Sequence, residues 1–160
     1  MGLRNWLKAV LKKSFEALRG WVADKQSGDR SAPGQFSYLT RFVFDRRHFS
    51  RVPPTAKPGA FLPESSTLKT SASWKDGLLE DEIWQIGLSV GEGRGKPPLA
   101  RADFDRGTVS KAKLRLEFDP MPHNSRHVNI CGWPTAKDEQ KSIALLLCKR
   151  ATLLLRETAE

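Results

Sequence analysis

The chain has 160 residues, of which 39% are hydrophobic, and its 27 Lys and Arg against 18 Asp and Glu give a net charge of +9. A chain of this length buries a core without help from a disulfide or a metal, and Cys131 and Cys148 are too few for a secreted disulfide scaffold. We expect reduced thiols in a cytoplasmic protein. The positive excess predicts attraction to nucleic acid, an anionic membrane or an acidic protein.

Residues 3–25 have the pattern of an amphipathic helix, and we expect residues 1–25 to form an interaction helix. An apolar stripe of this size does not stay exposed on a monomer. We expect the stripe to pack on the chain's own domain or a second copy, on another protein, or on a membrane surface. We expect no transmembrane helix, because no segment reaches the roughly 18 apolar residues that one requires. The expected docking residues are Trp6, Leu7, Val10, Leu11, Leu18 and Trp21.

Residues 26–35 have the composition of a linker, which predicts a basic domain over residues 36–160. Within it, residues 36–44 alternate as a strand, with Phe36, Tyr38, Thr40, Phe42 and Phe44 on one face. The four prolines of residues 51–63 require extended or turn-like backbone. Residues 67–74 predict a second strand.

The rest of the domain continues this mixture of strands and helices. Leu79, Ile83, Ile86 and Val90 have helical spacing and predict a helix over residues 78–90. Further expected elements are a flexible basic loop at 91–98, strands at 114–118 and 128–133, a helix at 136–150 with Thr135 as its N-cap, and a last turn or final strand at 151–155. The order predicts an α+β fold: a small, mostly antiparallel sheet with two packed helices, preceded by the amphipathic helix.

Two basic runs, residues 41–57 and 94–115, form the candidate nucleic-acid interface. On one face they would make a groove for a phosphate backbone, with Phe49 and Trp74 as stacking surfaces. Alternatively they are solvated loops, in which Arg101 and Arg106 pair with neighbouring aspartates. No established nucleic-acid-binding motif accompanies them. The candidate residues are Arg46, Arg47, Arg51, Arg94, Lys96, Arg101, Lys111 and Lys113.

Residues 121–134, MPHNSRHVNICGWP, crowd several reactive side chains together. His123 and His127 are four apart, but the nearby prolines oppose a helix and no metal-binding pattern is present, so we expect neither a metal nor a cofactor. The interpretation that we favour is structural. It places Val128 and Ile130 in the core, with His127 and Asn129 pointing outward or bonding turn backbone.

An enzymatic alternative uses His48 and His127. Each is followed two positions later by a polar residue, as in the two-histidine phosphoesterases, where one imidazole takes a proton from a ribose hydroxyl and the other protonates the leaving oxygen. Asn129 stands where that family has its second hydroxyl residue. In this alternative the protein is a metal-independent ribonuclease or phosphoesterase.

Several segments together are similar to a family of small bacterial proteins: AKPGAFLP at 56–63, GLLEDEIWQIG at 77–87 and HVNICGWPTAKDEQK at 127–141. The resemblance covers residues 36–155. It implies a bacterial, intracellular protein with mobile-element or defence genes as its expected neighbours, and brings no established activity. It also implies that the N-terminal helix is an added element.

These observations favour a non-enzymatic binding subunit of a bacterial intracellular complex. The N-terminal helix would dock on a partner or a second copy, and the basic loops would contact RNA, DNA or an acidic protein. The alternatives are the two-histidine phosphoesterase and a peripheral membrane protein anchored by the helix.

Overall fold

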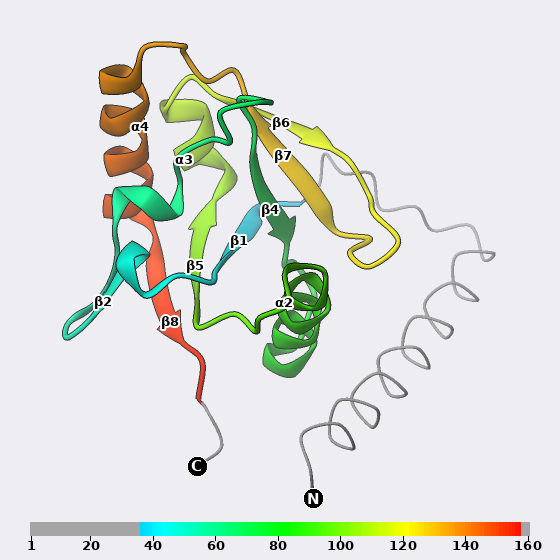
Figure 1. The fold of residues 1–160 in the computed structure, drawn as a ribbon. Coiled ribbons are helices and arrows are strands. Elements are labelled where there is room, and N and C mark those ends of the chain that lie inside the picture. The colour runs from blue at the N-terminus through cyan, green and yellow to red at the C-terminus, as the bar shows by residue number, and fades with distance from the viewer. Residues whose placement is uncertain (1–35, 158–160) are drawn as a thin grey trace, which may run out of the picture. The chain divides into compact units, whose positions relative to one another are not determined.

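The computed structural model describes residues 36–157, which belong to one compact unit beginning at Phe36. Six strands form an antiparallel sheet in the order β6-β7-β4-β1-β5-β8, and β2 and β3 form a separate two-stranded sheet (Figure 1). The strands are β1 (Tyr38–Val43), β2 (Phe49–Arg51), β3 (Pro54–Ala56), β4 (Thr70–Trp74), β5 (Ala100–Asp105), β6 (Arg115–Phe118), β7 (His127–Cys131) and β8 (Thr152–Leu155).

Three α-helices and two short 3-10 helices complete the described residues. They are η2 (Arg46–His48), η3 (Pro58–Ala60), α2 (Glu80–Arg94), α3 (Arg106–Lys111) and α4 (Lys137–Arg150). The predicted α+β class with a mostly antiparallel sheet is confirmed. The predicted helix over residues 1–25 and the linker at 26–35 lie outside the described residues. No helix within residues 36–157 is long and apolar enough to cross a membrane.

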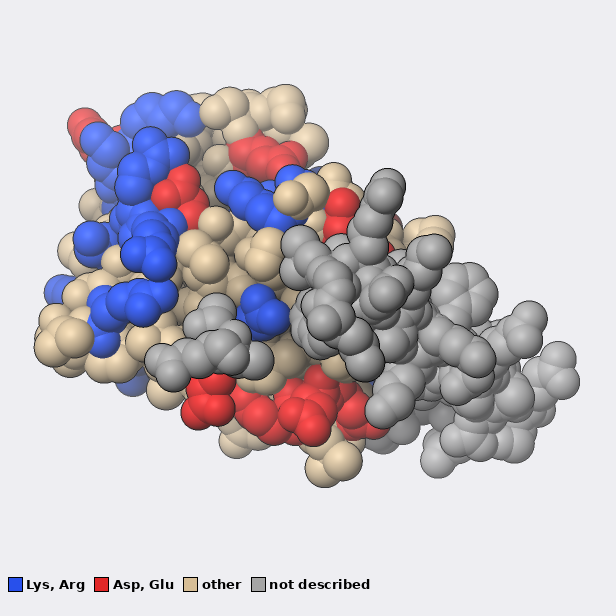
Figure 2. Space-filling model, turned by 60° about the horizontal axis from the view of Figure 1, so that its bottom comes forward, with Lys and Arg blue, Asp and Glu red and all other residues tan. Residues whose placement is uncertain are grey.

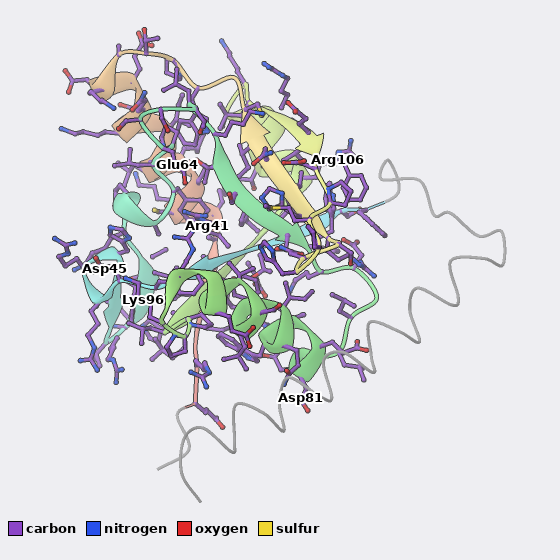
Figure 3. All side chains as sticks on the ribbon, turned by 45° about the vertical axis from the view of Figure 1, so that its right-hand side comes forward. Arg41, Asp45, Glu64, Asp81, Lys96 and Arg106 are labelled. Atoms are coloured by element: carbon purple, nitrogen blue, oxygen red, sulfur yellow. The ribbon has the colours of Figure 1, made fainter. Side chains whose placement is uncertain are left out.

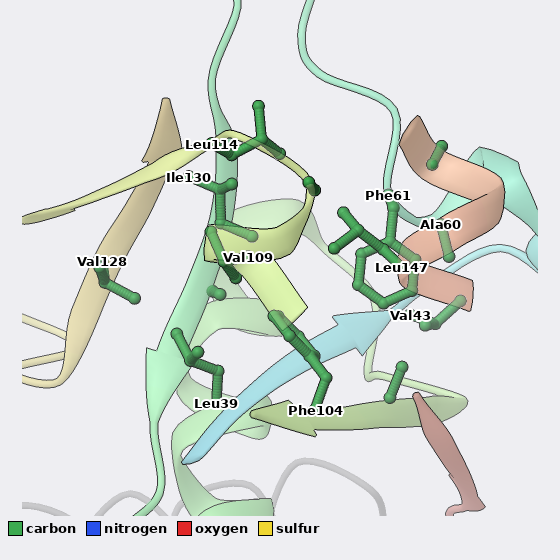
Figure 4. Packing of buried hydrophobic residues seen from close by; sticks show 14 of the residues in the cluster. Leu39, Val43, Ala60, Phe61, Phe104, Val109, Leu114, Val128, Ile130 and Leu147 are labelled. Carbon is green, nitrogen blue, oxygen red and sulfur yellow. The ribbon is translucent and has the colours of Figure 1, made fainter. Parts of the chain in front are cut away.

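The main core lies between one face of the sheet and α3, α4 and η3 (Figure 4). Side chains alternate between the two faces along each strand, so Leu39 and Val43 of β1 face this core while Phe42 faces the other side. The expected burial of Val128 and Ile130 is confirmed, because both are fully buried in β7. His127 and Asn129 do not point outward, since both are buried on the opposite face. The other alternative, a bond to turn backbone, is confirmed for His127, whose Nδ1 donates to the Asp119 carbonyl between β6 and β7.

Helix α2 packs on that opposite face through a close contact with β1. A Cβ added at Gly87 would meet the Phe42 ring at 2.5 Å, so only glycine allows this approach. The helix continues to Arg94, four residues past the predicted end, and Gly95 ends it with a φ of 69°. The expected loop at 91–98 therefore begins later than the sequence indicated.

Neither β5 nor α3 was predicted, and the short elements η2, β2, β3 and η3 were not predicted as helices or strands. Ala100, Ala102 and Phe104 of β5 face the core, while Arg101 and Asp103 lie beneath α2. The Asp105 side chain caps α3 by accepting a hydrogen bond from the Thr108 amide at 2.7 Å.

The predicted N-cap of the last helix is also wrong. Ala136 takes the N-cap position and makes no side-chain cap, and α4 begins at Lys137. Gln140 instead secures this end of the helix, because its side-chain amide donates to the Pro134 carbonyl at 2.7 Å. Residues 151–155 were expected to form either a last helical turn or a final strand, and residues 152–155 form the strand β8.

The contact between α2 and β1 can be tested with matched glycine substitutions in one helix. Gly87→Ala should lower the free energy of unfolding by about 1–3 kcal/mol, because the new methyl group overpacks the buried Phe42 ring. Gly93→Ala should raise it by roughly 0.5–1 kcal/mol, since nothing lies within 4 Å and alanine favours the helix. Urea denaturation measures both. Equal effects of the two substitutions would contradict this packing.

Candidate nucleic-acid interface

Basic side chains from two distant segments gather on one side of the described domain, where Figure 2 shows Lys and Arg concentrated. One segment is η2 with the start of the β2–β3 hairpin, and the other is the end of α2 with the loop after it. All the side chains involved are exposed. We name the set the basic cluster; it consists of Arg46, Arg47, Arg51, Arg94 and Lys96.

The electrostatics of His48 show that the two segments are neighbours. Burial lowers the pKa of His48, and the attraction of Asp45 opposes this. The positive charges of Arg47 and Lys96 lower the pKa further, although Arg47 belongs to η2 and Lys96 follows α2. Both segments of the basic cluster therefore act on the same imidazole.

Local hydrogen bonds hold η2 in place. Asp45 is its N-cap and accepts from the Arg47 amide at 2.9 Å and from the Arg47 guanidinium at 2.7 Å. These bonds hold the pKa of Asp45 well below its usual range. Arg47 is thus partly neutralised, whereas Arg46 and Arg51 make no ion pair within the described residues.

Three of the candidate residues do not join the basic cluster. Lys111 and Lys113 lie beside Asp138 and Glu139 in an open groove between α3 and the start of α4, which weakens any local positive field. The prediction that Arg101 contacts a polyanion is wrong, because only 2% of it is exposed. Only the start of the second basic run, Arg94 and Lys96, therefore shares a side with the first run.

Arg101 instead fastens α2 to the sheet. Its guanidinium bonds Glu80 at 2.7 Å and lies 3.3 Å from Asp103, which in turn pairs with Lys75 at 2.6 Å. The Arg101 guanidinium also lies 5.0 Å from the ring centre of Trp84, whose indole N–H donates to Glu80 at 2.8 Å. The hydrogen bond from Arg101 lowers the pKa of Glu80.

The expected stacking surfaces are also absent from this interface. Phe49 is 4% exposed and Trp74 is 2% exposed, so neither ring can receive a base. The exposed groups of the basic cluster carry charge, which suits contact with phosphates more than contact with bases.

A polar groove begins beside the basic cluster, where β1 and β4 separate. The two strands share only two register pairs, Leu39 with Trp74 and Thr40 with Ser73. Beyond them the Arg41 side chain enters the opening and donates to the Ser71 carbonyl at 2.7 Å and to the Ala60 carbonyl at 3.0 Å. A cation therefore occupies a place where strand pairing would otherwise continue.

The groove has a volume of about 370 Å³. Charged or hydrogen-bonding side chains enter it from β1, β4, the end of α2 and the turn before β7. Its polar lining residues are Arg41, Glu64, Ser71, Ser73, Arg94, His123, Asn124 and His127. Arg94 belongs both to the basic cluster and to this groove. Sequence reasoning missed Arg41 and His123 as site residues; the signal for Arg41 was a charged residue between Leu39 and Val43, on the core-facing side of β1.

The structure does not bring His48 into this groove with His127. The His48 ring lies against Gly59 of η3, at 2.7 Å from the position of an added Cβ. His127 Nδ1 donates to the Asp119 carbonyl at 2.7 Å, which leaves Nε2 without a hydrogen bond among the described residues. The two-histidine mechanism requires both imidazoles to reach one phosphate, and the groove offers His123, not His48, as the neighbour of His127.

Neither cysteine behaves as an activated thiol. Cys131 and Cys148 are both free. Burial raises the pKa of Cys131, and burial raises that of Cys148 to about 12. Within residues 36–157, no group of three or more His, Cys, Asp and Glu side chains could hold a metal ion.

The six expected docking residues of the N-terminal helix lie outside the described residues.

No protein-family model matches the chain, and neither a curated protein nor a solved structure is significantly similar to it.

The structural role of Arg101 separates it from the basic cluster in a stability measurement. Arg101→Ala should lower the free energy of unfolding by about 3 kcal/mol, because it removes the buried guanidinium that pairs with Glu80 and Asp103 and leaves Asp103 with Lys75 alone. Lys111→Ala, at an exposed position, should change it by less than about 0.5 kcal/mol. Denaturant unfolding compares the two variants. A loss below about 1 kcal/mol in Arg101→Ala would show that the network contributes little.

Proposed function

We propose that the protein is a cytoplasmic, non-enzymatic binding subunit that contacts the phosphates of nucleic acid through the basic cluster. The observation that carries the proposal is the meeting of two basic segments, around η2 and at the end of α2, on one exposed side. Lys and Arg side chains bind the nucleic-acid backbone by neutralising phosphates and releasing counterions.

The arrangement supports sequence-independent binding. Arg46, Arg51 and Lys96 are exposed and make no ion pair within residues 36–157. Within residues 36–157, Phe49 beside them is buried, and the half-buried Phe44 ring is covered by the Arg94 guanidinium, 4.9 Å from its centre, so neither ring is free to stack on a base. Contacts to phosphates position a protein without reading bases, so we expect similar affinity for different sequences.

The second part of the proposal concerns the N-terminal helix. The apolar stripe within residues 3–25, which includes the six expected docking residues, needs a surface to cover it. We propose that it docks in a groove of a partner protein or of a second copy, as amphipathic helices do. The basic cluster and the helix would then bring nucleic acid to the assembly.

Charge removal from the basic cluster should weaken nucleic-acid binding in a salt-dependent manner. The variant Arg46→Ala/Arg51→Ala/Lys96→Ala should lose most of its affinity for a single-stranded oligonucleotide at low salt. The slope of log affinity against log salt should shrink by about two, because three phosphate contacts are removed. Fluorescence anisotropy measured at several salt concentrations gives both quantities.

A control variant removes the same charge elsewhere. Lys111→Ala/Lys137→Ala/Lys141→Ala changes three exposed lysines on α3 and α4 and should keep most of the affinity and slope. Equal losses of affinity in both triple variants would show that binding depends on net charge alone, and would contradict binding through the basic cluster. Absence of binding by the wild type at low salt would overturn the nucleic-acid proposal and favour an acidic protein as partner.

The helix proposal predicts a change in assembly. Leu7→Glu/Leu11→Glu places two carboxylates on the apolar stripe and should abolish an assembly formed by the wild type, while the domain stays folded. Light scattering reports the mass, and circular dichroism checks the fold. Lys8→Glu/Lys12→Glu is the matched control on the polar half of the helix and should leave the mass unchanged. An unchanged mass in Leu7→Glu/Leu11→Glu would refute docking through this stripe.

A further inference from the structure

We propose that the groove around Arg41 is a specific binding site for a phosphoryl group, such as the terminal phosphate of a nucleic-acid strand or a free phosphate ester. Arg94 is the one residue of the basic cluster that also lines this groove. This inference goes beyond the proposed function and stands without it.

The first argument is the missing counter-ion of Arg41. Both of its hydrogen bonds within the described residues go to backbone carbonyls, of Ser71 and Ala60, and it forms no salt bridge with a carboxylate there. Burial, reinforced by the positive charge of Arg94, lowers the pKa of Arg41 to about 10, which leaves the guanidinium charged near neutral pH. Arg41 is partly buried, and a partly buried charge that has no carboxylate partner is unfavourable, so a bound anion would stabilise it.

The second argument is the set of donors that face the same space. Arg41 uses Nε and Nη1 for backbone carbonyls, so Nη2 keeps its donors. Arg94 enters from the end of α2, with its guanidinium 4.9 Å from the centre of the Phe44 ring. The Ser71 hydroxyl lines the groove and makes no hydrogen bond within residues 36–157. Two guanidinium groups suit the several oxygens of a phosphoryl group better than the two oxygens of a carboxylate.

The third argument is that two histidines, His123 and His127, line the same groove. His123 is exposed, and His127 is held by the Asp119 carbonyl with its Nε2 unpartnered. Neutral imidazole has one N–H donor, and His127 already uses it for the Asp119 carbonyl, so His127 Nε2 donates to an anion only in the protonated ring. His123 lines the same groove and offers an N–H donor in either protonation state.

One lining residue opposes an anion. Glu64 attracts Arg41 but forms no ion pair with it within 4.0 Å, and its side chain also accepts from the Thr67 hydroxyl at 3.5 Å. Figure 3 shows Glu64 on one side of Arg41 and Lys96 on the other. Glu64 is exposed, whereas Arg41 is partly buried, so the Glu64 carboxylate stays in solvent and opposes an anion less than its charge alone would suggest.

The test is calorimetric titration of the full chain with inorganic phosphate in low-salt buffer. We expect saturable binding of phosphate. Arg94→Ala should weaken it about tenfold, because one charged hydrogen bond is lost. Arg41→Lys should weaken it at least as much, because lysine lacks the guanidinium fork. Glu64→Gln should strengthen it roughly two- to fivefold by removing a nearby negative charge.

A second titration distinguishes the sources of the phosphoryl group. If an oligonucleotide with a 5′ phosphate binds about tenfold more tightly than its 5′ hydroxyl form, the site recognises strand ends. Equal affinities of the two forms, together with phosphate binding, assign the site to a free phosphate ester.

The inference is overturned if inorganic phosphate does not bind the wild type. It is also overturned if Arg94→Ala and Glu64→Gln leave phosphate binding unchanged, whatever happens to the fold of Arg41→Lys. Failure here differs from failure of the basic cluster: the variant Arg46→Ala/Arg51→Ala/Lys96→Ala should keep phosphate binding while losing the oligonucleotide.

Discussion

The insertion of Arg41 between β1 and β4 is the interaction on which the rest of the arrangement depends. The six-stranded sheet consists of two halves, β6-β7-β4 and β1-β5-β8, that meet along only two register pairs. Arg41 continues the junction by bonding the Ser71 carbonyl across the opening and the Ala60 carbonyl of η3. The same side chain thus bridges the two halves of the sheet and supplies the groove with a partly buried positive charge.

Helix α2 places the remaining charges. Its first turn carries Glu80, Asp81 and Glu82, and its last turn carries Arg94, an order that the helix dipole favours. Arg101 and the contact of Gly87 with Phe42 fasten the helix across the sheet. In Figure 3 the acidic end, marked by Asp81, and the basic end, marked by Lys96, point in different directions. The basic end thereby reaches η2 and the mouth of the groove.

Elements with a strong periodic pattern of apolar residues were predicted from the sequence. Elements in which charged residues interrupt that pattern were missed. The alternation of β1 and β7 and the apolar spacing of α2 and α4 were sufficient to place these elements. In β5 the inward residues include two alanines, and the intervening Arg101 and Asp103 indicated a solvated loop, whereas the pair is buried under α2. Local charge does not reveal a partner 21 positions away, such as Glu80.

The candidate site was only partly predictable for the same reason. Net charge pointed to a polyanion, and Arg46 and Arg51 are exposed as expected. The contribution of Arg94 and Lys96 to the same side depends on the length and direction of α2, which the sequence did not fix. The meeting of Arg41, Arg94 and His127 depends on sheet order, because β7 and β1 are separated by β4.

The most direct measurement is a nuclear magnetic resonance titration of the full chain with a 5′-phosphorylated single-stranded oligonucleotide at low salt, following backbone amides and arginine Nε–H groups. The account predicts shifts confined to η2, β2, the end of α2 and the residues that line the groove, including the Nε–H of Arg41. Shifts centred on α3 and α4, or no saturable shifts at all, would contradict it.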